Sequence, residues 1–305
     1  MNPTIQPRQG LLWARVRLTN KRILRSEFAS IGVLLVLAGL LIAGTGDRVL
    51  NLGSVPSGGT ITPFDAPGAG TGPQQGTLAY AINEGGTVAG YYFDSNPMTH
   101  GFLRLPNANG TFITVDAPGG GTGAYQGTFV FGFNSGNWIT GFVRDSSDVF
   151  HGYLRAPGRA FTTFDVPGAG TGQFQGTEPS DINGTEDIAG SYVDSSNVNH
   201  GFVRAADGTI TAFDVPGAGT GPGQGTLIGT VDNLNSTGTI SGYFLDASDV
   251  YHGYTRTADG TTTQLDDPNA GTGPQQGTEF SGINDAGMIT GYILTRTRCF
   301  TVLFS

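Results

Sequence analysis

The sequence contains little cysteine and few of the motifs that mark common enzymes. Its single cysteine, Cys299, excludes an intramolecular disulfide and any zinc site built from cysteines. Neither G-x-S-x-G nor H-E-x-x-H occurs, and no glycine run continues into the Lys-Ser/Thr of a phosphate-binding loop. The usual sequence signatures of hydrolases and nucleotide-binding proteins are therefore missing.

Charge is also scarce, at 13% of residues, and it is unevenly distributed. Six basic residues lie in the first 30 positions beside a single acid, Glu27. The remainder has 9 basic and 23 acidic residues, a formal net charge of −14. Such an acidic body repels phosphate backbones, which argues against nucleic acid as a partner.

The basic N-terminus leads into an uncharged apolar stretch, IGVLLVLAGLLIAG, at residues 31–44. A membrane-spanning helix needs about 20 apolar residues, so this length is marginal, and a basic segment before a shorter apolar core is typical of a secretory signal. We expect residues 1–46 to form a signal peptide or an uncleaved signal-anchor; a buried core helix is the third possibility. Residues 47–59 then form a linker. The body is expected outside the cytoplasm, extracellular, at the cell surface or in the periplasm, with membrane contact only through this segment.

One motif of the body, Asp-x-Pro followed by glycines and closed by Gln-Gly-Thr, occurs five times. Its aspartates, residues 65, 116, 165, 214 and 266, lie 49 to 52 residues apart. A period near 50 indicates a solenoid, a propeller or another repeat array. With 51 glycines, the chain has the composition of an all-β protein rich in turns.

Each period contains four short β candidates separated by turn residues. The first unit shows them as TLAYAI, TVAGYYFD, HGFLRL and TFITVD. Four antiparallel strands per unit of about 50 residues match a propeller blade, whereas a β-helix, the rival fold, has shorter coils. The repeated motif would join the outer strand of one blade to the inner strand of the next. Its proline ends strand pairing, its glycines allow positive φ, and its aspartate could form an Asx-turn.

The two ends of the array are complementary. Residues 60–65 resemble a fourth strand without a preceding unit, and residues 278–305 hold three strands without a fourth. We therefore predict a monomeric five-bladed β-propeller over residues 60–305, closed by the N-terminal strand, because closure removes exposed sheet edges. The predicted blades are 77–116, 128–165, 177–214, 226–266 and 278–305 plus 60–65.

These residues resemble the bacterial extracellular repeat family known as HAF, after its His-Ala-Phe-like element. That element is His-Gly-Phe or His-Gly-Tyr here and begins at positions 100, 151, 200 and 252. It follows a segment similar to INEGGTVAGYYFD and precedes a segment similar to FDVPGA. The resemblance covers residues 61–305, although Cys299-Phe300 replaces the element in the last unit and the preceding aspartate is absent there. It implies an exported bacterial repeat protein, and it implies no activity, since the family has none established.

All four histidines occupy one repeat position, six residues after an aspartate. We expect the loop between each aspartate and histidine to lie on the same face of the propeller as the repeated motif. The candidate ligand-binding residues are Asp94, His100, Asp145, His151, Asp194, His200, Asp246, His252, Gln75, Gln126, Gln175, Gln224 and Gln276. Carboxylate, imidazole and amide groups suit sugar hydroxyls. The alternative is that these groups only stabilise a repeated turn.

No cofactor is predicted. Ca²⁺ needs six to eight oxygen ligands, and one Asp and one His per loop are too few. The recurrent arginines at 104, 155, 204 and 256 are expected to pair with a recurrent aspartate on a neighbouring strand rather than to bind anions.

The function predicted from these features is non-enzymatic, multivalent binding or adhesion to a polysaccharide or cell-surface component. A secreted polysaccharide lyase or hydrolase acting at the axial mouth is one alternative. A structural surface scaffold is the other.

Overall fold

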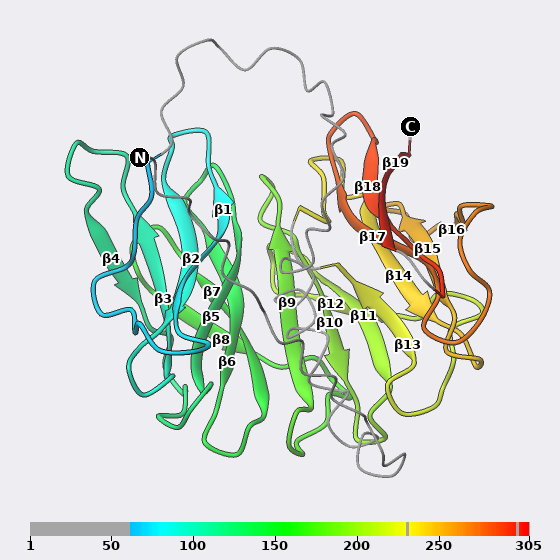
Figure 1. Ribbon diagram of the computed structural model, residues 1–305, viewed down its shortest axis with the longest axis horizontal. Coiled ribbons are helices and arrows are strands. Elements are labelled where there is room, and N and C mark those ends of the chain that lie inside the picture. The colour runs from blue at the N-terminus through cyan, green and yellow to red at the C-terminus, as the bar shows by residue number, and fades with distance from the viewer. Residues whose placement is uncertain (1–61, 230–231, 297–298, 305) are drawn as a thin grey trace, which may run out of the picture. The chain divides into compact units, whose positions relative to one another are not determined.

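The computed structural model describes residues 62–229, 232–296 and 299–304, and within them every regular element is a β-strand (Figure 1). The all-β prediction is therefore confirmed for this part of the chain. The predicted signal or anchor segment and the linker lie outside the described residues. The described residues contain no helix that is long and apolar enough to cross a membrane.

The strands form successive units that follow the predicted period. Unit 1 comprises β1 (Gly76–Ile82), β2 (Val88–Phe93), β3 (Thr99–Arg104) and β4 (Phe112–Val115). Unit 2 comprises β5 (Gly127–Phe133), β6 (Ile139–Arg144), β7 (Phe150–Arg155) and β8 (Phe161–Phe164). Unit 3 comprises β9 (Gly176–Ile182), β10 (Ile188–Val193), β11 (Asn199–Arg204) and β12 (Ile210–Phe213). Unit 4 comprises β13 (Gly225–Ile228), β14 (Ile240–Leu245), β15 (Tyr251–Arg256) and β16 (Thr262–Gln264). Unit 5 comprises β17 (Gly277–Ile283), β18 (Ile289–Leu294) and β19 (Cys299–Phe304).

Strands within a unit pair antiparallel in chain order, as β1–β2, β2–β3 and β3–β4 do in unit 1. Neighbouring units meet through one parallel bridge, such as Thr99 with Gly127 between β3 and β5. Because a β-helix is built from parallel ladders, this pairing contradicts that alternative.

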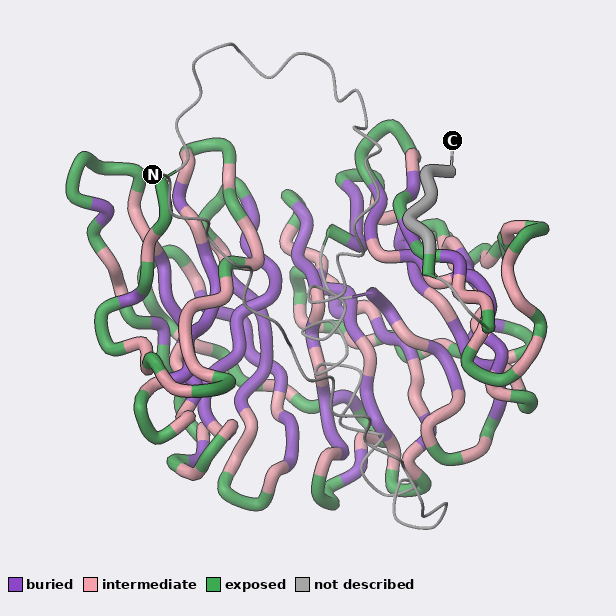
Figure 2. Tube along the Cα trace, in the orientation of Figure 1, coloured by how far each residue is buried: buried purple, intermediate pink, exposed green. Residues whose placement is uncertain are grey.

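Apolar side chains are buried where one unit meets the next. Leu103 of unit 1 packs in one cluster with Phe133 and Ile139 of unit 2, and Leu154 of unit 2 packs with Ile182 and Ile188 of unit 3. Figure 2 shows the buried residues along the strands and the exposed residues mainly in the turns. Each unit is thus stabilised mainly by its neighbours, as expected when apolar faces of stacked sheets leave water.

The repeated motif is the connection between units, as predicted, and we call it the crossing (residues 65–77, 116–128, 165–177, 214–226 and 266–278). The last threonine of each crossing forms a hydrogen bond back to the start of the same crossing. The Thr177 hydroxyl accepts a hydrogen bond from the Val166 N–H at 2.9 Å, and the same bond recurs at all five crossings. Thr128, Thr177, Thr226 and Thr278 are buried, so each hydroxyl satisfies an N–H that water cannot reach.

The leading segment, residues 60–65, was predicted as a strand that pairs with the last unit. Thr62 to Phe64 form no strand, and within the described residues β19 pairs only with β18. Phe64 nevertheless packs as an outer-strand residue should, with its ring 6.3 Å from Phe102, just as Phe164 lies 6.2 Å from Phe202. Closure of the array therefore stays a prediction.

Candidate functional site

The crossings and the loops between the second and third strands are joined by hydrogen bonds. At the first junction Tyr125 N–H donates to Pro97 O at 2.7 Å, and Gly121 N–H donates to Arg144 O at 2.9 Å. The first of these bonds recurs at 2.7 Å after units 2, 3 and 4. The predicted common face is thereby confirmed, and we call it the crossing face.

Each histidine on this face lies between two aspartates. In unit 1, His100 Nε2 is 3.9 Å from Asp94 Oδ2, and Nδ1 donates to Asp116 Oδ2 at 3.0 Å. Units 2 to 4 repeat the arrangement with Nε2 distances of 3.5 to 3.6 Å and Nδ1 distances of 2.8 to 3.0 Å. The predicted Asp–His proximity is therefore present, but the closer partner is the aspartate of the crossing.

That second aspartate, at 116, 165, 214 or 266, was expected to form an Asx-turn in the crossing. It binds the histidine instead, because antiparallel pairing of the third and fourth strands sets the two residues side by side. Gly101 pairs with Val115, which places His100 beside Asp116. Each second aspartate follows its histidine by 14 to 16 residues, and this constant spacing is the feature of the sequence that could have indicated the contact.

The first aspartate forms the Asx-type turn. Asp246 Oδ1 accepts the N–H groups of Ser248 at 2.7 Å and Val250 at 2.9 Å, and its other oxygen faces His252. Burial raises the pKa of Asp246, but the hydrogen bonds from Val250, Ser248 and His252 outweigh it and hold the pKa below its ordinary value. Turn stabilisation, the alternative considered from the sequence, is thus one role of this residue.

An aromatic ring lies against the histidine in three of the units. Tyr92 stacks on His100 at 5.1 Å between ring centroids, Tyr192 on His200 at 4.8 Å and Phe244 on His252 at 4.8 Å. Tyr92 and His100 are cross-strand neighbours in the β2–β3 pair. In unit 2 the equivalent residue is Val143, and His151 is the most exposed of the four, at 33% of its side chain. In these three units the stacked ring restricts the plane of the imidazole that lies between the two aspartates.

The glutamines brace the crossings. Gln126 Oε1 accepts the Gly123 N–H at 2.9 Å, and its Nε2 donates to Asp148 Oδ1 at 2.8 Å. Gln75, Gln175 and Gln224 make the same pair of contacts to their own crossing and to the adjacent loop. Gln276 lies at the fifth crossing, where its N–H donates to Gly273 O at 3.0 Å. Internal bonds occupy most of these amides, and in each of units 1 to 4 the second aspartate is more exposed than the histidine or the first aspartate.

The recurrent arginines do not pair as predicted. Arg104 lies over the ring of Phe64 at 4.8 Å, Arg204 over Phe164 at 5.1 Å and Arg256 over Phe213 at 4.5 Å. Each ring belongs to the preceding outer strand or, for Phe64, to the leading segment. The guanidinium is weakly hydrated and stacks on aromatic faces, so here it joins neighbouring units. Arg155 is different and lies 5.7 Å from Phe161 of its own unit.

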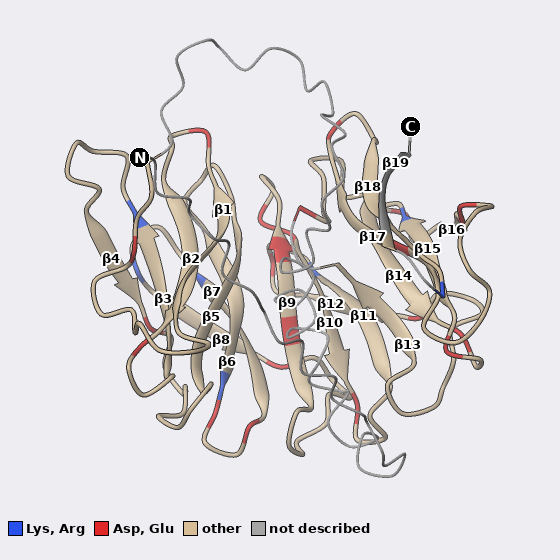
Figure 3. Ribbon diagram, viewed as in Figure 1, with Lys and Arg blue, Asp and Glu red and all other residues tan. Residues whose placement is uncertain are grey.

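No group of three or more His, Cys, Asp or Glu suited to a metal ion occurs among the described residues. Two carboxyl groups elsewhere are unusual. Glu178 on β9 and Glu279 on β17 are partly accessible residues whose carboxyl groups are surrounded by protein, and burial raises the pKa of each to about 7. Figure 3 shows acidic residues mostly in turns, with β9 as an exception.

Comparison with known proteins gives no family. No protein-family profile and no curated protein matches the chain. Among solved structures, a mutant of the Aleuria aurantia lectin in complex with alpha-methyl-L-fucoside is similar at 11% identity and a TM-score of 0.38, covering 75% of this chain and 76% of that one. The same lectin with Fucalpha1-6GlcNAc is similar at 13% identity and a TM-score of 0.27, covering 76% of this chain and 95% of that one. Function must therefore be argued from the site itself.

Proposed function

We propose that this chain is an exported, non-enzymatic protein that binds a polysaccharide or another cell-surface component through its crossing face. The observation that supports this most is the recurrence of one group in four units: a histidine between two aspartates. The second aspartates at 116, 165 and 214 expose 47% to 57% of their side chains. The carboxylates can accept hydrogen bonds from the hydroxyls of a sugar, and an imidazole N–H can donate one to them.

The repetition favours weak binding at many points over one strong site. Each group offers only a few polar atoms, so a single contact would have low affinity. A polymer with repeating hydroxyls can engage several equivalent groups, and linked contacts strengthen each other through effective concentration. An enzyme, by contrast, needs one asymmetric arrangement of catalytic groups.

We also propose that the units close into a five-bladed propeller. The contact between Phe64 and Arg104 resembles the contact between Phe164 and Arg204 at a unit junction, which supports a fourth-strand role for the leading segment. Within the described residues β19 is the third strand of unit 5, and no fourth strand of that unit is among them. Pairing the two would remove both free edges. Export follows from the basic and apolar N-terminus.

Replacing three of the second aspartates should strongly weaken binding without changing the fold. The triple variant Asp165→Asn, Asp214→Asn and Asp266→Asn keeps side-chain size and removes three carboxylates. We expect its retention on a binding polysaccharide to fall by about tenfold or more, since multivalent contacts are lost together. The measurement is co-sedimentation of the full chain with cellulose, chitin, xylan and bacterial cell-wall fractions.

The matched control is Asp187→Asn, Asp207→Asn and Asp259→Asn, which makes the same charge change in turns at the other ends of the strands. It should sediment as the unmodified protein does. Absence of retention on every fraction would contradict the proposal, and so would equal loss in both triple variants.

A second candidate is a polysaccharide lyase or hydrolase, and the two glutamates favour it. A carboxyl group with a pKa near 7, such as Glu178 or Glu279, is suited to general acid or base catalysis at neutral pH. Under this candidate the chain should release reducing ends from one of the same polysaccharides. Glu178→Gln should stop this release, whereas Glu186→Gln, in the turn between β9 and β10, should not. Absence of cleavage by the unmodified chain would eliminate this function.

A further inference from the structure

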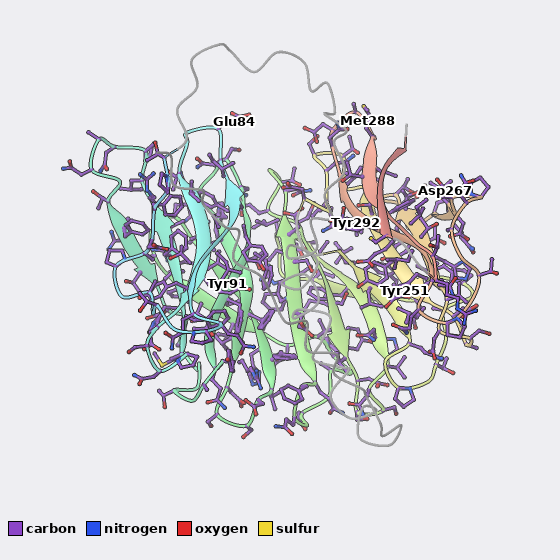
Figure 4. All side chains as sticks on the ribbon, in the orientation of Figure 1. Glu84, Tyr91, Tyr251, Asp267, Met288 and Tyr292 are labelled. Carbon is purple, nitrogen blue, oxygen red and sulfur yellow. The ribbon has the colours of Figure 1, made fainter. Side chains whose placement is uncertain are left out.

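An open-sided cavity of about 420 Å³ lies between unit 4 and unit 5. Its lining comes from the first turn of each unit with the strand residues beside it, from Thr255 on β15 and from Leu265, which directly follows β16 (Thr262–Gln264). Met288 marks the turn of unit 5 beside it (Figure 4). The volume falls in the range of small-molecule sites.

The cavity exists because one repeat position departs from the others. The residue that pairs with the second residue of the second strand is Leu103 in unit 1, Leu154 in unit 2 and Val203 in unit 3. Each of these three residues packs in or against an apolar cluster that includes residues of the following unit. The equivalent residue of unit 4 is Thr255, which pairs with Ser241. Unit 4 thus has a polar side chain, smaller than the leucines of units 1 and 2 and equal in size to Val203, where the other three units pack an aliphatic one.

The floor and the rim of the cavity differ in polarity. Leu265, Ile283 and Ile289 supply apolar surface, with Leu265 37% exposed. The hydroxyl of Thr255 makes no hydrogen bond within the described residues. Asp285 Oδ1 accepts the Ser236 N–H at 2.8 Å, and Asp285 is an exposed residue at the rim of the cavity.

The geometry points to a neutral sugar unit as the occupant of this cavity. A pyranose ring has an apolar face for the floor and hydroxyls that can donate to Asp285 and exchange hydrogen bonds with Thr255 and Thr239. An anionic ligand would be repelled by Asp285, because the hydrogen bond from Ser236 holds the pKa of that carboxyl below its ordinary value. A cationic ligand would find one carboxylate and no aromatic face among the lining residues. This inference does not depend on the crossing face.

The test fills the cavity with the residue that units 1 and 2 carry. Thr255→Leu should raise the melting temperature and weaken sugar binding by about tenfold or more, since it removes both the space and a hydrogen-bonding group. Binding of D-glucose, D-galactose, L-fucose and N-acetyl-D-glucosamine to the full chain is measured singly, by calorimetry or ligand-observed NMR. We expect at least one to bind the unmodified chain with millimolar affinity.

A second variant keeps the proposal falsifiable if Thr255→Leu does not fold. Asp285→Asn retains an acceptor for Ser236 and should also weaken binding about tenfold. Thr211→Leu, at an exposed position of β12, and Asp259→Asn, in another turn, are the matched controls and should bind as the unmodified chain does. The crossing-face triple variant should bind these sugars unchanged, which separates this site from the proposed function. The inference would be overturned if the unmodified chain bound none of the four sugars, or if Thr255→Leu and Asp285→Asn both bound a sugar as tightly as the unmodified chain does.

Discussion

Alanine in place of Gly176 should destabilise the protein by roughly 4 kcal/mol, which lowers the melting temperature by about 10 °C. Gly176 is the glycine of Gln-Gly-Thr, and its φ of 122° is one that L side chains rarely adopt. A Cβ there would also collide with the backbone oxygen of Phe150 in the preceding unit. The close approach is the parallel bridge between Phe150 and Gly176, so neither residue can move away. Thermal and urea unfolding measure the effect.

Gly184→Ala is the matched control. This glycine lies in an exposed turn of the same unit, and a Cβ there meets no atom within 4 Å. Its replacement should change the free energy of unfolding by less than about 0.5 kcal/mol. Equal stability of the two variants would show that the Gly176 bridge does not hold neighbouring units together.

The same substitution at Gly76 tests closure of the array. Gly76 has a φ of 121°, but within the described residues a Cβ there meets nothing within 4 Å, because no described third strand lies against it. In a closed propeller β19 would take the place of the preceding third strand and bring its backbone against this position. We therefore expect Gly76→Ala to cost as much as Gly176→Ala, and a cost near 1 to 2 kcal/mol, from φ alone, would contradict closure.

Replacing Glu178 and Glu279 by leucine should stabilise the protein at pH 8 by about 2 kcal/mol for each residue. The inner-strand position that they share holds Leu78, Phe129 and Leu227 in the other units, so the fold does not require an acid there. Burial raises the pKa of both glutamates to about 7. Because both residues are partly accessible, we expect less than the full free energy that such shifts would give.

The pH dependence has a definite sign. A carboxyl whose pKa is higher in the folded state binds its proton more tightly there, so stability is greatest near pH 5 and falls as the pH rises toward 7. Asp181, whose pKa burial raises to about 6, acts in the same direction. The aspartates with lowered pKa values lose their contribution only in more acidic solution.

Urea unfolding between pH 5 and pH 8 measures this slope. In the double variant Glu178→Leu, Glu279→Leu, the free energy of unfolding should keep only the pH dependence that Asp181 contributes. Glu84→Leu, at an exposed turn of unit 1, is the control and should keep the full slope. A pH-independent free energy of unfolding in the unmodified chain would refute the raised pKa values.

Within the described residues, the sequence alone determined the strands and their order. The 49- to 52-residue period and the short β candidates between turn residues predicted four strands per unit, and in units 1 to 4 the structure places them within a few residues of those positions. The crossing as the link between units was predicted as well, since proline and glycine act on the backbone locally. Each of these signals depends on neighbours in the chain.

The partners of the repeated side chains were decided only by tertiary structure. Asp94 and His100 are close in sequence, so their proximity could be predicted, whereas Asp116 reaches His100 through the register of the β3–β4 pair. Arg104 contacts Phe64, about 40 residues away along the chain, because the leading segment packs against unit 1. Likewise, the cavity beside Thr255 exists because two units fail to fill the space between them. Repetition in the sequence specifies one unit at a time, and contacts between units depend on how the sheets pack, which no local pattern encodes.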